Sequence, residues 1–209
     1  MIKEYLVGKE VVASEMMKEV DRCRKSLELA SAGNTVALVS GGDPGIYAMA
    51  GLVFEMAKDA GSSCIIEVIP GIAAVNGCAA RLGAPLMHDF AAISLSDLLT
   101  PWPVIEKRLI AAAAADFVVA IYNPKSKKRT EQIVRAARIF LDHRDPATPV
   151  GIVTAATREN EEITITTLEK LQDADIGMQS TVIIGNSQTY IWEGKMVTPR
   201  GYADKYELK

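Results

Sequence analysis

The chain has 209 residues, of which 49% are hydrophobic and 23% charged, and its formal net charge is -3. This length is enough for one large domain or two small ones, each with a buried core. No apolar run approaches the roughly 20 residues of a membrane-spanning helix, and the acidic balance argues against a general nucleic-acid binder. We therefore expect no membrane and no nucleic-acid partner.

The first residues and the cysteines bear on the cellular location of the chain and on metal binding. The opening "MIKEYLVGKEVV" lacks the apolar core and the small-residue cleavage site of a secretory signal peptide. Cys23, Cys64 and Cys78 are odd in number and form no CxxC pair, which argues against a structural zinc site. The chain is predicted to be cytoplasmic, to carry its cysteines as small buried hydrophobes, and to bind no metal.

The first hundred residues alternate between strand-like and helix-like segments. A helix is expected from an N-cap at Ser14 to a stop at Gly33, and short apolar runs at Val36–Val39 and Cys64–Ile69 predict buried parallel strands. A helix follows each strand-like run, ending near Ala60 in the first case. This rhythm predicts an α/β domain over residues 1–100 with a mainly parallel sheet and helices on both faces.

The pattern changes near two prolines that flank Trp102. Pro103 is well placed to open a helix, strands are expected at Phe117–Tyr122 and Pro149–Ala155, and a helix is expected between them. The period then shortens to two in "EITITTLEKL" and "STVIIGN", which indicates antiparallel pairing. We therefore predict a second α/β domain over residues 101–209 with a mixed sheet.

Three loops marked by glycine or proline follow predicted strands. They are "GGDPGIY" (Gly41–Tyr47), "PGIAA" (Pro70–Ala74) and "YNPKSKKR" (Tyr122–Arg129). Because the carboxyl ends of parallel strands lie at one edge of a sheet, a single cleft is able to use all three loops.

The loop around Asp43 suits close approach of a ligand to the backbone. Its glycines permit positive φ, and the carboxylate accepts hydrogen bonds from hydroxyl or ammonium groups. The alternative interpretation is structural: Asp43 caps the following helix, with Pro44 in its first turn. The loop matches neither the Walker phosphate-binding pattern nor GxGxxG.

The third loop packs four cations into five residues: Lys125, Lys127, Lys128 and Arg129. Basic residues at a helix start oppose the helix dipole, so they indicate either a site for a polyanionic substrate or a solvated helix start. The residue Asn123 precedes a proline and is expected to be extended, with its backbone and side chain directed into a cleft.

His88 and Asp89 form an adjacent pair with the chemistry for proton transfer near neutral pH. The alternative is that the histidine is structural. His143 lies in the charged turn "DHRD" and is expected at the surface.

Taken together, the segments "GDPGIYAMAG", "IPGIAAVNGCAARLGAPLMHDFAAISLSDLLTPW" and "YNPKSKKR" resemble the tetrapyrrole methylases, which methylate corrinoid and sirohaem precursors with S-adenosylmethionine. The last two segments are similar to the precorrin-3B C(17)-methyltransferase branch of cobalamin biosynthesis. The resemblance extends from about Gly8 to Tyr202 and implies two α/β domains, a methyl donor in the cleft between them, and a homodimer.

The resemblance also implies which residues meet the donor. The backbone around Gly41, Gly42 and Asp43 would bind its methionine part, with Ile46 beside it. The remaining donor residues would be Ala73, Ala74, Tyr122, Asn123 and Ala156.

By the same resemblance, the reaction methylates carbon 17 of the macrocycle and contracts the ring, and it leaves S-adenosylhomocysteine. Methyl transfer is an in-line displacement for which the protein mainly aligns donor and acceptor. The substrate is a tetrapyrrole rimmed with carboxylates, so Lys125, Lys127, Lys128 and Arg129 are the candidate cations, with Arg158 as a weaker one. His88 and Asp89 are the candidates for proton transfer during ring contraction.

Two alternatives and one open question accompany this prediction. Family members begin with a further strand and a GxGPG loop, and because nothing in this sequence matches them the chain is alternatively a catalytically impaired tetrapyrrole- or partner-binding protein. A nucleotide-dependent enzyme that binds phosphates with the same loops is a further alternative. The sequence does not distinguish a cobalt-containing substrate from a metal-free one.

Overall fold

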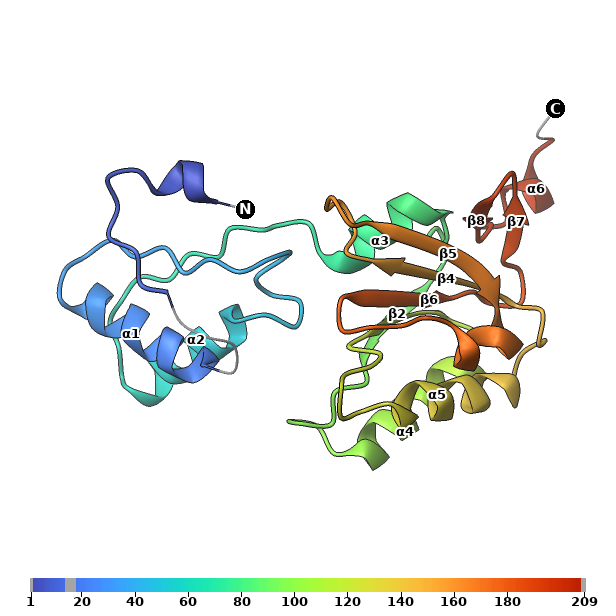
Figure 1. Cartoon of the computed structure of the whole chain (residues 1–209), viewed down its shortest axis with the longest axis horizontal. Coiled ribbons are helices and arrows are strands. Elements are labelled where there is room, and N and C mark those ends of the chain that lie inside the picture. Colours follow the sequence, from blue (N-terminus) through green and yellow to red (C-terminus); the bar gives the residue numbers. More distant parts are fainter. Residues whose placement is uncertain (1, 14–17, 208–209) are drawn as a thin grey trace. The chain divides into compact units, whose positions relative to one another are not determined.

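The structure is a computed structural model that describes residues 2–13 and 18–207. Its contacts divide the chain into two compact units, Met1–Ala73 and Ala74–Lys209, which are drawn in Figure 1. The predicted helix cap at Ser14 lies outside the described residues. In the described part of the chain, no helix is both long enough and apolar enough to cross a membrane.

The first unit contains a short 3₁₀ helix, η1 (Lys3–Leu6), and two α-helices, α1 (Glu19–Ser31) and α2 (Ala50–Asp59). The two α-helices pack around Cys23, Met49 and Val53. Cys23 is fully buried, as predicted, because it lies on the apolar stripe of α1. Cys64 is only half-buried, contrary to expectation, and its thiol lies 3.4 Å from the hydroxyl of Ser31.

The parallel sheet predicted for residues 1–100 is not formed in the first unit. The described residues before Ala74 include no strand, and Val36–Val39 and Cys64–Ile69 make no ladder hydrogen bonds. Burial still alternates along the two segments: Leu38 and Ile66 pack against the helical core, whereas Ile65 is fully exposed. A strand requires a hydrogen-bonded neighbour as well as an apolar run, and these segments have none among the described residues.

The second unit is built on a five-stranded mixed sheet with the order β2-β3-β6-β4-β5. β2 runs parallel to β3, whereas β6 runs antiparallel to both β3 and β4, and β5 runs antiparallel to β4. The strands are β2 (Phe90–Ser94), β3 (Val118–Tyr122), β4 (Pro149–Thr154), β5 (Glu162–Thr167) and β6 (Ser180–Ile184). The α/β class with a mixed sheet is therefore confirmed.

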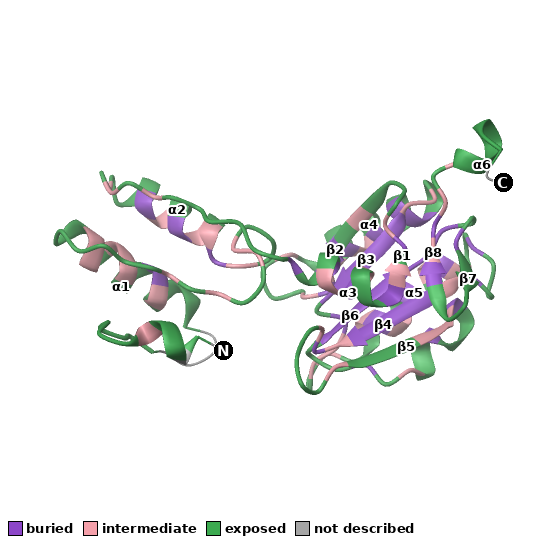
Figure 2. Cartoon of the chain, turned by 90° about the horizontal axis from the view of Figure 1, so that it is seen from above, coloured by how far each residue is buried: buried purple, intermediate pink, exposed green. Residues whose placement is uncertain are grey.

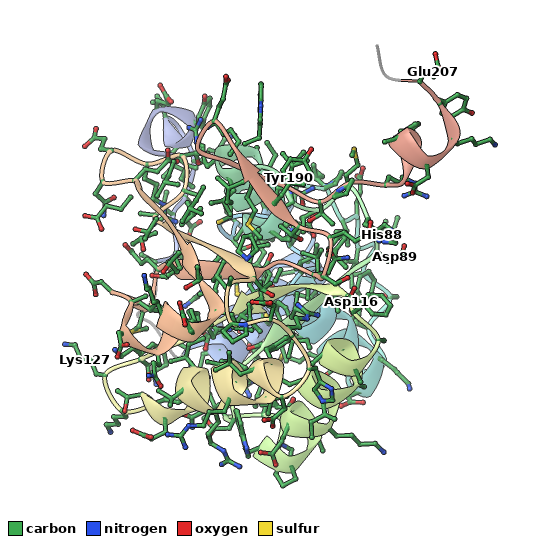
Figure 3. All side chains as sticks on the ribbon, turned by 90° about the vertical axis from the view of Figure 1, so that its right-hand side faces the viewer. His88, Asp89, Asp116, Lys127, Tyr190 and Glu207 are labelled. Carbon is green, nitrogen blue, oxygen red and sulfur yellow. The ribbon has the colours of Figure 1, made fainter. Side chains whose placement is uncertain are left out.

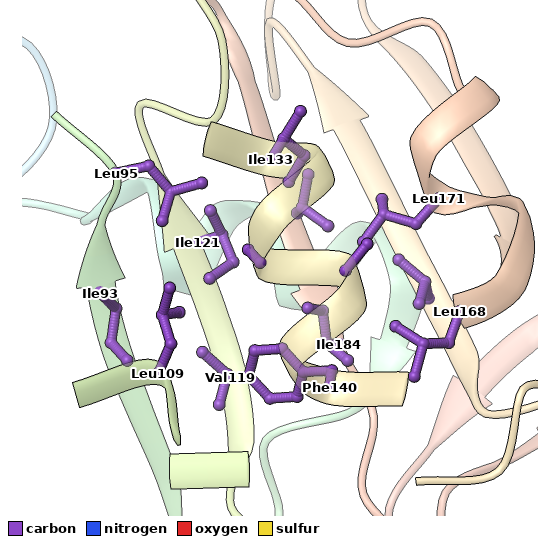
Figure 4. Packing of buried hydrophobic residues seen from close by; sticks show 14 of the residues in the cluster. Ile93, Leu95, Leu109, Val119, Ile121, Ile133, Phe140, Leu168, Leu171 and Ile184 are labelled. Atoms are coloured by element: carbon purple, nitrogen blue, oxygen red, sulfur yellow. The ribbon is translucent and has the colours of Figure 1, made fainter. Parts of the chain in front are cut away.

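Helices cover both faces of this sheet. On one face, α4 (Trp102–Ala114), α5 (Glu131–Leu141) and the 3₁₀ helix η2 (Leu168–Asp173) enclose the main core, which includes Phe140 (Figure 4). On the other face, α3 (Ala74–Leu82) packs against β4 and β6. β3 and β6 are buried along their whole length, as Figure 2 shows. β3 is a continuous apolar run, which is typical of a strand covered on both faces and explains why the sequence predicts it.

A smaller three-stranded sheet completes the second unit, with the order β1-β8-β7. Its strands are β1 (Gly83–Ala84), β7 (Tyr190–Trp192) and β8 (Lys195–Val197), and a short helix, α6 (Tyr202–Lys205), follows.

The division between the units lies earlier in the chain than the boundary expected at residues 100 and 101. Two contacts account for the difference. β2 pairs in register with β3, and Leu82 of α3 packs against Gly151 of β4. These contacts join residues 74–100 to the second unit, and both depend on residues far apart in the sequence.

Candidate active site

In the first unit, the carboxylate of Asp43 links two of the predicted loops. Its Oδ1 accepts a hydrogen bond from the Gly45 amide at 2.8 Å, and its Oδ2 accepts one from the Gly71 amide at 3.0 Å. The Gly71 and Gly45 amides hold the pKa of the Asp43 carboxyl below its usual value. The loops Gly41–Tyr47 and Pro70–Ala74 are thus brought together through an ionised side chain.

Glycine is required where these two loops touch. A Cβ at Gly71 would lie 2.2 Å from the carbonyl oxygen of Gly42, a distance that no side chain permits. Gly42 itself has a φ of +81°, in the left-handed region that favours glycine. A Cβ at Gly41, in contrast, would meet nothing within 4 Å. The loop therefore presents open, polar backbone beside an ionised carboxylate.

The structural alternative for Asp43 is wrong. α2 begins at Ala50, its N-cap residue is Met49, and no side chain caps it. Asp43 lies upstream, where its carboxylate closes a tight turn onto the Gly45 amide. Of the other residues predicted in these loops, Ile46 is exposed and Ala73 is buried.

In the second unit, the carboxyl ends of β2, β3 and β4 lie at one edge of the sheet. β3 and β4 are both antiparallel to β6 and therefore point in the same direction, as does β2. The segments that follow these strands carry Asp97, Asn123 and Ala156. The structure thus brings the predicted residues Asn123 and Ala156 to a common edge.

Tyr122 ends β3 at this edge, and Asn123 follows it. The Tyr122 hydroxyl accepts a hydrogen bond at 2.9 Å from the amide of Val75 in the first turn of α3, where amides lack helical partners. This bond fixes the start of α3, to which the predicted residue Ala74 belongs. Asn123 has a φ of +49°, so the expected extended conformation is wrong. Asparagine tolerates the left-handed region better than most residues.

The loop after β4 is held by Glu161. Its carboxylate accepts hydrogen bonds from the Thr157 amide and, at 2.8 Å, from the Arg81 guanidinium. The Thr157 hydrogen bond, together with Arg81, lowers the pKa of the Glu161 carboxyl. Ala155 and Thr157, the neighbours of Ala156, have φ values of +51° and +64°. Such conformations persist only where surrounding contacts impose them.

The four cations of the third loop differ in their surroundings. The side chains of Lys127 and Lys128 are exposed, and Lys125 is half-buried. Arg129 donates a hydrogen bond from Nη2 to the Asn123 carbonyl oxygen at 2.8 Å. Arg158, the weaker candidate, is exposed in the loop after β4.

His88 and Asp89 lie at the opposite edge of the same sheet. They immediately precede β2, and the Asp89 carbonyl oxygen accepts a hydrogen bond from the amide of Val118 at the start of β3. Figure 3 shows them on the opposite side of this unit from Lys127. The Asp89 amide donates to Nδ1 of His88 at 2.7 Å. The structure does not bring this pair to Asn123 and Ala156, and its catalytic role stays a prediction.

Sequence reasoning missed the polar residues that hold these loops in place. They are Ser94 at the end of β2, Asp97 after it, and Glu161 with its partner Arg81. The edge argument that selected the loop of Asn123 did not find Ser94, because the sequence predicts no strand over Phe90–Ser94. Nothing in the sequence pairs Arg81 with Glu161, because their contact depends on how α3 packs.

A family model for Tetrapyrrole (Corrin/Porphyrin) Methylases matches residues 4–172 of the chain. The cobalt-factor III methyltransferase of Priestia megaterium is 51% identical over 100% of this chain and 39% of its own length. The probable cobalt-factor III C(17)-methyltransferase of Salmonella typhimurium is 48% identical over 97% of this chain and 84% of its own length. The chain therefore spans well under half of the first relative and most of the second.

The crystal structure of the methyltransferase CobJ is similar to this chain with a TM-score of 0.84 and 38% sequence identity. The similarity covers 92% of this chain and 81% of that one.

Proposed function

The chain belongs to the tetrapyrrole methylase family, and we propose that it transfers a methyl group from S-adenosylmethionine to carbon 17 of a corrin precursor, with contraction of the ring. The observation that carries this proposal is the 48% identity to the probable cobalt-factor III C(17)-methyltransferase of Salmonella typhimurium, over 97% of this chain and 84% of that relative. The geometry of the Asp43 loop, which holds open backbone beside a carboxylate, supports it.

The residues of the first unit fit the methionine part of the donor. An amino acid group requires acceptors for its ammonium and donors for its carboxylate, and exposed peptide groups supply both. The backbone of Gly41 is uncovered, Gly42 is exposed beside it, and Asp43 adds an ionised acceptor. We propose that these residues, with Ile46 and Ala73, bind the donor. When bound, S-adenosylmethionine supplies a methyl group activated on a sulfonium.

In the second unit, we propose Ala74, Tyr122, Asn123 and Ala156 for the same donor. Contacts within the unit fix the position of each of these residues. Tyr122 accepts a hydrogen bond from α3, which contains Ala74, and Asn123 accepts one from Arg129. Glu161 closes the loop that contains Ala156. Catalysis of a displacement depends on such alignment of the reacting groups. These residues therefore serve to orient and require no nucleophilic side chain.

The substrate in this proposal is a cobalt-containing tetrapyrrole with acetate and propionate side chains. The relatives named for cobalt-factor III support the cobalt form. Lys125, Lys127 and Lys128 are the proposed partners of the substrate's carboxylates, because their ammonium groups lie in a loop at the carboxyl edge and two of them are exposed. A homodimer, a cytoplasmic location and the absence of bound metal stay predictions.

Calorimetric titration with S-adenosylhomocysteine tests the donor part of this proposal. We expect one site per chain and no binding of ATP with Mg²⁺ in a parallel titration. Binding of ATP instead of S-adenosylhomocysteine would contradict the proposal and favour the nucleotide-dependent alternative. Binding of S-adenosylhomocysteine without any methyl transfer would favour an impaired tetrapyrrole-binding protein.

A further inference from the structure

Arg129 differs from the other cations of its loop in what it contacts. Only 15% of its side chain is exposed, whereas Lys127 and Lys128 are exposed. Its Nη2 donates to the Asn123 carbonyl oxygen at 2.8 Å, and its Nη1 lies 3.9 Å from Oδ1 of Asp97. The guanidinium is therefore engaged by protein groups on two sides.

Asn123 is held from a second direction by β2. Its Nδ2 donates to the hydroxyl oxygen of Ser94 at 3.0 Å. Ser94 is the last residue of β2 and pairs in register with Tyr122. The hydrogen bond that Asn123 donates to Ser94 fixes its side chain, and the one that it accepts from Arg129 fixes its carbonyl, although its φ is +49°. A backbone conformation of this kind is retained only where neighbouring contacts over-determine it.

Asp97 connects this arrangement to α5. Its Oδ2 accepts a hydrogen bond from Nε2 of Gln132 at 3.0 Å, and its Oδ1 faces Arg129. The backbone of Arg129 is fixed as well, because its carbonyl oxygen accepts a hydrogen bond from the Ser126 amide at 2.9 Å. The loop is therefore closed around Arg129 by contacts with protein groups.

We propose that Arg129 is a positioning residue, which holds Asn123 in its left-handed conformation for the methyl donor and does not bind the carboxylates of the substrate. The inference rests on the proposed function, because the donor role of Asn123 is part of that proposal. It departs from the sequence-based expectation, which grouped Arg129 with the three lysines as a cation for the substrate.

The chemistry of the guanidinium explains why arginine occupies this position. Its planar fork of N–H groups reaches a carbonyl and a carboxylate simultaneously, whereas an ammonium is a point charge on a flexible stem. Arg129→Lys is therefore expected to restore the charge without restoring the position of Asn123. A residue that attracts substrate carboxylates at long range would tolerate the same change.

The test measures binding of S-adenosylhomocysteine by calorimetry in Arg129→Gln and in a matched control, Arg138→Gln. Arg138 lies on α5 and is exposed, so its replacement removes the same charge without removing these contacts. We expect Kd to rise about tenfold in Arg129→Gln, to rise similarly in Arg129→Lys, and to change less than about twofold in the control.

Two further variants separate positioning from loss of stability. Asp97→Asn keeps Arg129 but removes the negative charge that faces it, so we expect the Kd for S-adenosylhomocysteine to rise in this variant too. This variant provides the test if Arg129→Gln does not fold. Because Arg129 acts through Asn123, adding Asn123→Ala to Arg129→Gln should weaken binding less than the two single effects combined.

Unchanged donor affinity in Arg129→Gln and Asp97→Asn, with a raised KM for the tetrapyrrole, would overturn the inference and return Arg129 to the substrate. Fully additive effects in the double variant would also overturn it. Failure of the unaltered chain to bind S-adenosylhomocysteine would instead contradict the proposed function itself, and the inference with it.

Discussion

At the scale of single residues, the carboxylate of Asp43 joins two loops through its hydrogen bonds. It accepts hydrogen bonds from the Gly71 and Gly45 amides, and these bonds lower its pKa. A carboxyl whose pKa is lower in the folded chain than in the unfolded chain stabilises the fold at pH values above its ordinary pKa, which is about 4. That contribution is lost as the pH falls below this value and through the folded pKa.

Asp43→Asn should therefore remove part of the acid sensitivity of the chain. The amide keeps one acceptor oxygen but carries no charge, so its hydrogen bonds do not titrate. The measurement is the urea midpoint of both chains between about pH 3 and about pH 6. We expect the difference between them to be largest at the upper end and to shrink as the pH falls. A constant difference across this range would contradict the role given to the carboxylate.

At the scale of elements, the contact between the loops Gly41–Tyr47 and Pro70–Ala74 depends on the absence of one side chain. Gly71→Ala would place a Cβ 2.2 Å from the carbonyl oxygen of Gly42, and because both partners are backbone, the loops must separate. Gly51→Ala is the matched control, since it lies in α2 and its Cβ would meet nothing within 4 Å.

We expect Gly71→Ala to lower the free energy of unfolding by about 1–3 kcal/mol and to weaken binding of S-adenosylhomocysteine. The control should be neutral or more stable by up to about 1 kcal/mol, because alanine is the better helix former. Urea denaturation and calorimetric titration of the two variants make the comparison. Equal stability of both variants would show that the loops are not in close contact.

A comparison of two segments explains why the sequence predicts some strands correctly and not others. The run Phe117–Tyr122 and the segment Val36–Val39 have similar composition, yet only the first contains a strand. The difference lies in the neighbours: β3 pairs with β2 and β6, whereas the segment in the first unit has no ladder partner among the described residues. Composition specifies an extended backbone, but pairing is set by distant residues.

At the scale of the whole molecule, the sheet topology determines which residues share an edge, but not what each of them contacts. Ala156, which the family resemblance implied, follows β4 at the same edge as Asn123, which follows β3. The rule that strand ends share an edge selected the loop of Asn123, but it also selected Gly41–Tyr47 and Pro70–Ala74, which follow no strand among the described residues. It had no means of predicting that Asn123 is left-handed, that Arg129 bonds to it, or that His88 lies at the opposite edge. Those features depend on side-chain contacts between segments far apart in the sequence.

The central claim is most directly tested by methyl transfer itself. The chain is incubated with S-adenosylmethionine that carries a trideuterated methyl group, together with cobalt-factor III or its metal-free counterpart, and the products are analysed by mass spectrometry and NMR. We predict a product with one labelled methyl group on carbon 17 of the cobalt form, and an equal amount of S-adenosylhomocysteine. Binding of the donor with no label in either tetrapyrrole would contradict the claim that this chain is a C(17)-methyltransferase.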